Sequence, residues 1–194
     1  MRVPLINPED MTERQNEIAA RIAGRRGAVR GPFQVWLNSP EVCERVEALG
    51  AWLRFESSLP LRLRELSLLI AARHFDAQYS WNAHADKAIE AGIPAGAISA
   101  IAQRREPVFD REEDTAFYVF CTELLREHFV SEATFRTAQA HFGTQGLVDT
   151  VASLGNFSML AMLLNAFEVD LQADREPPYP DIRGYARVEP AANP

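Results

Sequence analysis

The sequence predicts an all-α protein. Apolar residues recur at intervals of three and four along most of the 194-residue chain, which is the spacing of one helix face. Helix-start residues precede several of these segments, as in Asn38-Ser39-Pro40-Glu41. No alternation of apolar and polar residues is sustained long enough to predict a strand. With 47% hydrophobic residues, the chain is long enough to bury one sizeable core.

Three regions are expected in order along the chain. Residues 1–30 form an N-terminal arm and a helix that Asp10 or Thr12 caps. Residues 31–175 form the helical domain. Residues 176–194 form a proline-rich tail without periodicity, and one use for such a tail is to wrap a neighbouring subunit.

Within the domain, caps and apolar periodicity predict a series of helices. Asp76 is expected to cap the second helix of a central pair with its carboxylate. Glycine and proline mark the helix ends. The expected helices run from Pro40 to about Ser57, from Leu61 to the break before Asp76, from Asp76 to Gly92, from Ile93 to Gln103, from Asp110 onward, from Ser131 to Phe142, and from Leu147 to about Leu171.

The central pair, Leu61 to Ala102, carries the residues with chemistry to discuss. It reads Arg64-Glu65, an apolar helix, Tyr79-Ser80-Trp81-Asn82-Ala83-His84, and then Ala91-Gly92-Ile93. This order resembles the carboxymuconolactone decarboxylase family, which also holds the alkylhydroperoxidase D-like proteins. The resemblance implies a helical bundle built round a central helical hairpin, with Glu65 and His84 at the functional positions.

Two positions depart from the family patterns. Peroxidase members carry a Cys-x-x-Cys pair before the histidine, and the corresponding residues here are Ala77 and Ser80. Decarboxylase-like members tend to have a glutamate before the tryptophan, where this chain again has Ser80. Hydroperoxide reduction needs a reactive and a resolving thiol, so the thiol-dependent peroxidase activity is the less expected one.

His84 and Glu65 are the candidate catalytic residues. An imidazole titrates near neutral pH, so His84 suits proton transfer. If the two helices are antiparallel, Glu65 can approach His84 and set its tautomer, or accept the proton itself once burial raises its pKa. The alternatives are a structural His84 bonded to Glu65 or a carbonyl, and a Glu65 that forms a salt bridge with Arg62, Arg64 or Arg73.

The remaining candidates are expected to bind substrate. Ser80 lies four residues before His84 on the same helix face and suits a pocket wall. Of its neighbours Tyr79 and Trp81, one is expected to line the pocket and the other to pack in the core. Arg64 or Arg73 is expected to hold a substrate carboxylate, and His74 to reach the pocket mouth.

Composition narrows the class of protein further. A net charge of −7 argues against a nucleic-acid partner. No apolar run approaches the roughly 18 residues of a membrane span, and no signal-peptide core is present, so a cytoplasmic protein is expected. The two cysteines, Cys43 and Cys121, are far apart and suggest neither a redox pair nor a zinc site. No His and carboxylate spacing predicts a metal.

We therefore expect a cofactor-independent, decarboxylase-like enzyme that acts on a small carboxylated lactone or a related organic acid. The alternative is a non-catalytic binding or assembly protein that keeps the fold. A homo-oligomer is expected in either case, because the apolar final helix and the arms at both ends can bury surface between subunits.

Overall fold

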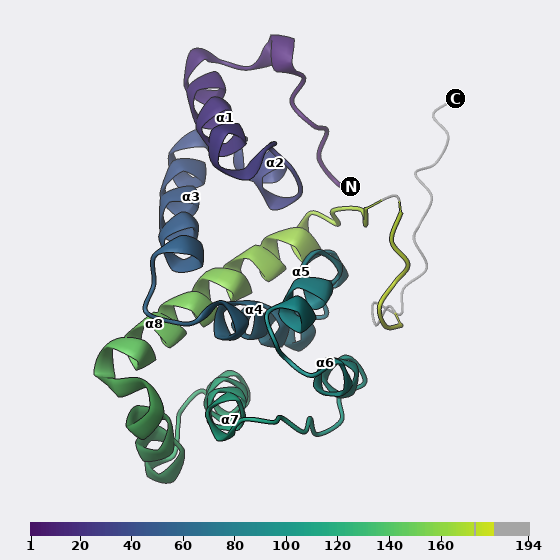
Figure 1. The fold of residues 1–194 in the computed structure, drawn as a ribbon. Coiled ribbons are helices and arrows are strands. Elements are labelled where there is room, and N and C mark those ends of the chain that lie inside the picture. Colours follow the sequence, from purple (N-terminus) through teal and green to yellow (C-terminus); the bar gives the residue numbers. More distant parts are fainter. Residues whose placement is uncertain (173, 181–194) are drawn as a thin grey trace.

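The computed structural model describes residues 1–172 and 174–180, and in these residues it is all-α, as predicted (Figure 1). Thr12 caps the first helix with a capping box, and the prolines at Pro32 and Pro40 begin the next two. The elements are a 3-10 turn at Pro8–Asp10 (η1), then α1 Glu13–Arg26, α2 Pro32–Trp36, α3 Pro40–Phe55, α4 Leu61–His74, α5 Gln78–Glu90, α6 Ala95–Ala102, α7 Glu112–Glu127 and α8 Glu132–Ala166.

Helix α4 forms the centre of the molecule. It packs against α5, α7 and α8, and every residue from Glu65 to Ala72 is buried. Its leucines join the largest apolar cluster, together with Trp81, Phe117 and Leu154 from the surrounding helices. Burying both faces of α4 fixes the position of the polar groups that this helix carries.

The N-terminal helices form a layer over one side of this centre. Figure 1 shows α1, α2 and α3 on one side of α4, α5 and α8, with α6 and α7 on the other side. The layer has an apolar cluster of its own, which includes Ile18, Ile22 and Phe33. Polar groups on its inner surface therefore face the α4–α5 hairpin.

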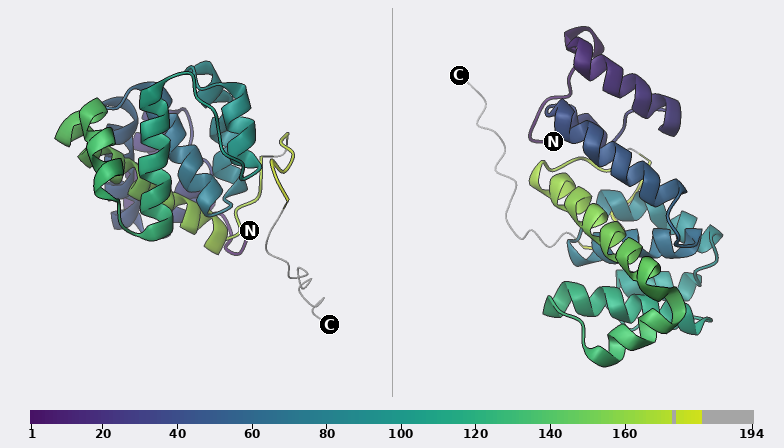
Figure 2. Two further views of the ribbon diagram at one scale, coloured as in Figure 1. Left: turned by 90° about the horizontal axis from the view of Figure 1, so that it is seen from below. Right: turned by 90° about the vertical axis from the view of Figure 1, so that its left-hand side faces the viewer.

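Helix α8 is sharply bent at Gly143 (Figure 2). Gly143 has φ 62° and ψ −178°, a conformation that favours glycine, so the chain breaks where the sequence predicted a boundary between two helices. By length and composition α8 could cross a membrane, but 56% of that apolar stretch is buried inside the molecule. Such burial is typical of a core helix in a bundle.

The predicted cap at Asp76 is wrong. Asp76 has φ 53°, and α5 begins after Ala77 without a side-chain cap. The Asp76 carboxylate instead forms ion pairs with Arg73 and, at 2.7 Å, with Arg104. Two guanidinium groups bind a carboxylate more strongly than one backbone amide does, so the side chain turns away from the helix start.

Residues 174–180 of the C-terminal segment pack along α5 of the same chain. Gln78 Nε2 donates to the Tyr179 carbonyl at 2.6 Å, and Asn82 Nδ2 donates to the Glu176 carbonyl at 2.8 Å. The Tyr179 ring is buried. Its centroid lies 5.7 Å from the centroid of the Trp81 ring and 4.2 Å from Cζ of the Arg73 guanidinium. Residues 181–194 of the predicted tail lie outside the described residues.

Candidate functional site

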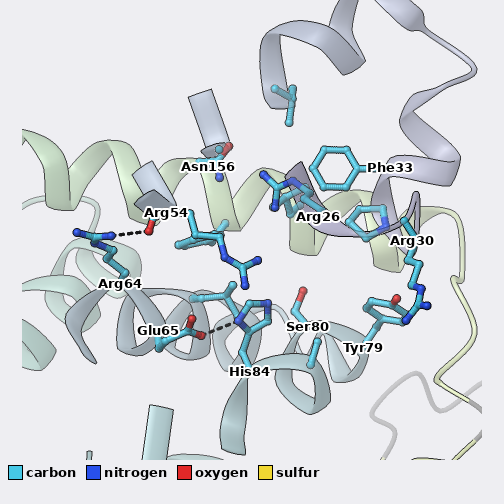
Figure 3. A pocket seen from close by; sticks show the side chains of 18 residues that line it. Arg26, Arg30, Phe33, Arg54, Arg64, Glu65, Tyr79, Ser80, His84 and Asn156 are labelled. Atoms are coloured by element: carbon cyan, nitrogen blue, oxygen red, sulfur yellow. Dashed lines mark hydrogen bonds and ion pairs between the residues drawn. The ribbon is translucent and has the colours of Figure 1, made fainter. Parts of the chain in front are cut away.

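The α4–α5 hairpin brings Glu65 and His84 together. His84 Nδ1 lies 2.6 Å from Glu65 Oε2, and both side chains are largely buried (Figure 3). Because α4 packs against α5 along its length, the two side chains meet although they are 19 positions apart. The approach predicted for an antiparallel pair is confirmed.

The pKa values of both partners lie below their ordinary values. Burial opposes ionisation of Glu65, but the hydrogen bond to His84 and the charges of His84, Arg54 and Lys87 outweigh it, so the pKa of Glu65 is lowered. Burial raises the pKa of Glu65 as predicted, but the net shift is downward, so the prediction of a raised pKa was wrong. Burial is the main cause that lowers the pKa of His84, and the Lys87 and Arg54 charges act in the same direction.

These shifts define the protonation state at neutral pH. Glu65 is ionised and His84 is neutral, so His84 Nδ1–H donates to the carboxylate. The lone pair then lies on Nε2, which has no hydrogen-bond partner among the described residues. The pair therefore presents an oriented imidazole that can accept a proton, and donate it again, at Nε2.

A cavity of about 210 Å³ lies beside this pair, between the N-terminal layer and the hairpin. Residues from α1, α2, α3, α4, α5 and α8 line it. Its polar wall holds four arginines, and Glu65 is the one acidic side chain among the described residues that line it. Its apolar lining includes Phe33, Val46, Leu68, Phe157 and Leu160. This combination suits a small organic anion with an apolar body.

The arginines of the cavity differ in what they already bind. Arg64 donates to the carbonyls of Leu59, Arg54 and Ser57, so it ties α3 to α4 rather than pointing to a ligand. The Arg54 guanidinium points towards His84 in Figure 3. Burial is the main cause that lowers the pKa of Arg26, and repulsion from the positive charge of Arg54 is the second. An anion between Arg54 and Arg26 would relieve this repulsion.

The other predicted site residues are divided between three places. Tyr79 and Ser80 line the cavity, and the Ser80 hydroxyl points into it (Figure 3). Trp81 is buried in the core. Arg73 and His74 lie away from His84, in a separate cavity of about 140 Å³ between α4, α6 and α7.

Sequence reasoning missed four polar residues of the cavity: Arg26, Arg30, Arg54 and Asn156. Only Arg54 could have been found from the sequence. It lies four residues after Gly50 and eight after Val46, so all three share one face of α3, and that face lines the cavity. Arg26 ends α1, Arg30 lies in the connection that follows it, and Asn156 is a polar residue in an apolar part of α8. Their convergence depends on how the N-terminal layer packs.

Neither cysteine takes part in the site. Cys43 is buried in the N-terminal layer and Cys121 in the core, and neither lines the cavity. Burial raises the pKa of Cys43 to about 11 and raises that of Cys121 as well. Within the described part of the chain, no group of three or more His, Cys, Asp or Glu side chains is placed to hold a metal ion.

No protein-family model matches the sequence, and no curated protein matches it. Solved structures do match. A peroxidase-related protein from Silicibacter sp. TM1040 has a TM-score of 0.72 at 16% identity, covering 89% of this chain and 91% of its own. An alkylhydroperoxidase AhpD core protein from Ralstonia eutropha has a TM-score of 0.73 at 16% identity, covering 89% and 92%.

A third similar structure is that of the debrominase Bmp8 in complex with 2,3,4-tribromopyrrole. Its TM-score is 0.71 at 12% identity, and the match covers 89% of this chain and 92% of that one. At such identities the likeness concerns the fold. The chain therefore has the alkylhydroperoxidase D-like fold that the central motif implied.

Proposed function

From this fold and its arginine-lined cavity, we propose that the protein is a cofactor-independent enzyme of the carboxymuconolactone decarboxylase type. It acts by acid/base proton transfer on a small carboxylated lactone or a related organic acid. The observation that supports this proposal is the buried His84–Glu65 pair, whose free Nε2 opens into a cavity lined by arginines.

The proposed reaction uses His84 as the acid/base and Glu65 as the group that orients it. An anionic substrate beside His84 favours the imidazolium, so His84 takes a proton from solvent at Nε2. The bond between the substrate carbon and its carboxylate then breaks, carbon dioxide leaves, and the electron pair remains as an enolate. His84 Nε2–H delivers its proton to that carbon, and the neutral imidazole is restored.

Arg54 is the proposed partner of the substrate anion. Its guanidinium points towards His84, whereas Arg64 is bound to backbone carbonyls and Arg73 lies in the other cavity. Arg54 would first bind the carboxylate and then stabilise the enolate oxygen, since both carry negative charge next to the same imidazole.

The test uses purified protein and carboxymuconolactone, with carbon dioxide release and substrate absorbance as readouts. His84→Ala is expected to lose about 10²- to 10⁴-fold of turnover, the usual contribution of an acid/base group. His141→Ala is the matched control, because His141 is an exposed residue of α8 that does not line the cavity. Circular dichroism checks that both variants fold.

A second pair of variants tests the anion site. Arg54→Gln is expected to raise KM about ten- to a hundredfold, because it removes a charged hydrogen bond. Arg45→Gln, on the exposed face of α3, should leave KM unchanged. Turnover that survives in His84→Ala would contradict the proposal, and no turnover with any small carboxylated lactone would favour a non-catalytic binding protein.

A further inference from the structure

The second cavity, between α4, α6 and α7, takes no part in the proposed reaction. Its volume is about 140 Å³, whereas roughly 10–15 Å³ is enough to hold one water molecule, so it has room for a small ligand. Among the described residues that line it there are three arginines and no acidic side chain. Its apolar wall is formed by Ile70, Ile101 and Leu125.

Two of the three arginines keep donors free at this cavity. Arg73 is fixed in the wall, because its Nε donates to the Ala102 carbonyl at 2.8 Å and its guanidinium pairs with Asp76. Arg104 pairs with Asp76 through one nitrogen, at 2.7 Å, and its side chain is 55% exposed. Arg126 is exposed, and its guanidinium has no hydrogen-bond or ion-pair partner among the described residues. A ligand can therefore reach both Arg104 and Arg126.

The charges that act on His74 show that this side of the cavity is positive. His74 lines the cavity beside the arginines. Burial is the main cause that lowers its pKa, and the positive charges of Arg104, Arg126 and His128 lower it further. The carboxylate of Asp76 offsets only part of this charge, since two arginines share it. The cavity thus has an excess of positive charge that an anion would balance.

The opposite wall adds a neutral donor. Tyr118 lines the cavity, and its hydroxyl has no hydrogen-bond partner in the described part of the chain. Burial is the main cause that raises the pKa of Tyr118; the Glu106 charge also raises it, and the Arg126 charge lowers it. The hydroxyl therefore keeps its proton at neutral pH and can donate it in a hydrogen bond to an anion.

Backbone strain is concentrated around the same cavity. Four non-glycine residues of the described chain have a positive φ, and three of them, Asp76, Arg104 and His128, lie at this cavity or next to it. Residues held in such conformations cluster at functional sites. The strained turns after α4 and α6 are joined by the ion pair of Asp76 and Arg104, which holds the Arg104 side chain at the cavity.

We propose that this cavity, the Arg126 site, binds a phosphate dianion, either free or as a small phosphate monoester. Arg104 and Arg126 bind the phosphate oxygens, Arg73 adds charge from the wall, and the apolar wall contacts the organic part of a monoester. Phosphate is favoured over a carboxylate because each guanidinium can form two parallel hydrogen bonds, and phosphate offers enough oxygens for both. This inference does not rest on the proposed function.

Calorimetric titrations at pH 8 with three probes test the ligand class. Phenyl phosphate is a dianion at this pH, because its second pKa is about 6. Benzenesulfonate has the same ring and three oxygens but one charge. Phenyl phosphate is expected to bind about tenfold more tightly than benzenesulfonate, the effect of one charged hydrogen bond. Equal affinity for the two, or no saturable binding of any phosphate, would overturn the proposal.

Inorganic phosphate is the third probe, and it distinguishes the two sources of the dianion. Tighter binding of phenyl phosphate than of inorganic phosphate would assign the site to monoesters, because only these contact the apolar wall. Equal or weaker binding of phenyl phosphate would assign it to free phosphate. Both results support a phosphate site.

Histidine ring signals in NMR spectra show which cavity is occupied. Phenyl phosphate is expected to shift the signals of His74 and to leave those of His84, in the other cavity, unchanged at the same concentration. Arg126→Gln should reduce the affinity reported by His74 at least about tenfold. Arg136→Gln, at an exposed position of α8, is the matched control and should bind as the wild type does.

The same measurements can refute the site and remain separate from the proposed function. A shift of His84 without a shift of His74, or undiminished affinity in Arg126→Gln, would place the anion elsewhere and overturn the proposal. Arg54→Gln, which removes an arginine from the other cavity, should leave the His74 titration unchanged. Thermal unfolding of each variant establishes that altered binding does not come from loss of the fold.

Discussion

The protonation of His84 and Glu65 links the candidate site to the stability of the protein. Both groups have pKa values below their ordinary 6.5 and 4.5, so the folded state resists taking up these protons. The unfolded chain takes up protons at higher pH than the folded chain does. Each group therefore stabilises the fold above its ordinary pKa, and that stabilisation is lost as the pH falls towards the folded value.

This linkage predicts how a single substitution changes the pH dependence of stability. The free energy of unfolding of the wild type should fall as the pH drops from 7.5 to 5. His84→Gln keeps a neutral amide that can donate to Glu65 and cannot titrate, so its free energy of unfolding should fall less over this range. Each unit by which the pKa is lowered is worth about 1.4 kcal/mol.

Urea unfolding at pH 7.5, 6 and 5 measures the effect. His141→Gln serves as the control for replacing a histidine by glutamine, because His141 is exposed and does not line the cavity. A His84→Gln protein with the same slope as the wild type would show that His84 takes up its proton at the same pH in the folded and unfolded states.

Single residues also show how far the sequence could predict the site. Glu65 and His84 were predictable because one helical hairpin brings them together, and short connections constrain such pairs strongly. Arg26 and Asn156 were not, since they come from helices 130 positions apart in sequence that meet only through tertiary packing. A single sequence carries no periodicity that relates such distant positions.

At the scale of elements, periodicity and caps predicted most helices because each is a local property. The N-cap at Thr12 and the start at Pro40 follow from the nearest few residues. The cap at Asp76 failed because Arg104, from the connection after α6, competes for the same carboxylate. Local rules fail where a distant charged group offers a stronger partner.

The bend in α8 gives a prediction about an element. Gly143→Ala is expected to destabilise the protein by about 1–3 kcal/mol, because alanine adopts the Gly143 conformation only with strain. Gly155→Ala is the control within the same helix, at a position with open space around it, and should stabilise by up to about 1 kcal/mol. Chemical denaturation measures both. A Gly143→Ala protein as stable as the wild type would show that the backbone at position 143 does not require glycine.

At the scale of the whole molecule, the described chain leaves large apolar side chains exposed on two helices that pack together. On α3 these are Leu49, Trp52 and Phe55, and on α8 they are Val148, Val151 and Met162. Phe55 is 54% exposed and Val148 is 62% exposed. Scattered single exposures are common in monomers, whereas several on neighbouring helices are typical of surfaces that associate.

We therefore predict that the protein is a homo-oligomer that uses this α3–α8 surface. Light scattering coupled to size exclusion should give a mass that is a multiple of the chain. Phe55→Glu combined with Val148→Glu should reduce that mass, because each introduces a charge that an apolar interface cannot solvate. Val108→Glu, 80% exposed in the connection between α6 and α7, should keep it. A wild-type monomer at micromolar concentration would refute the prediction, and an oligomer unaffected by the double variant would place the interface elsewhere.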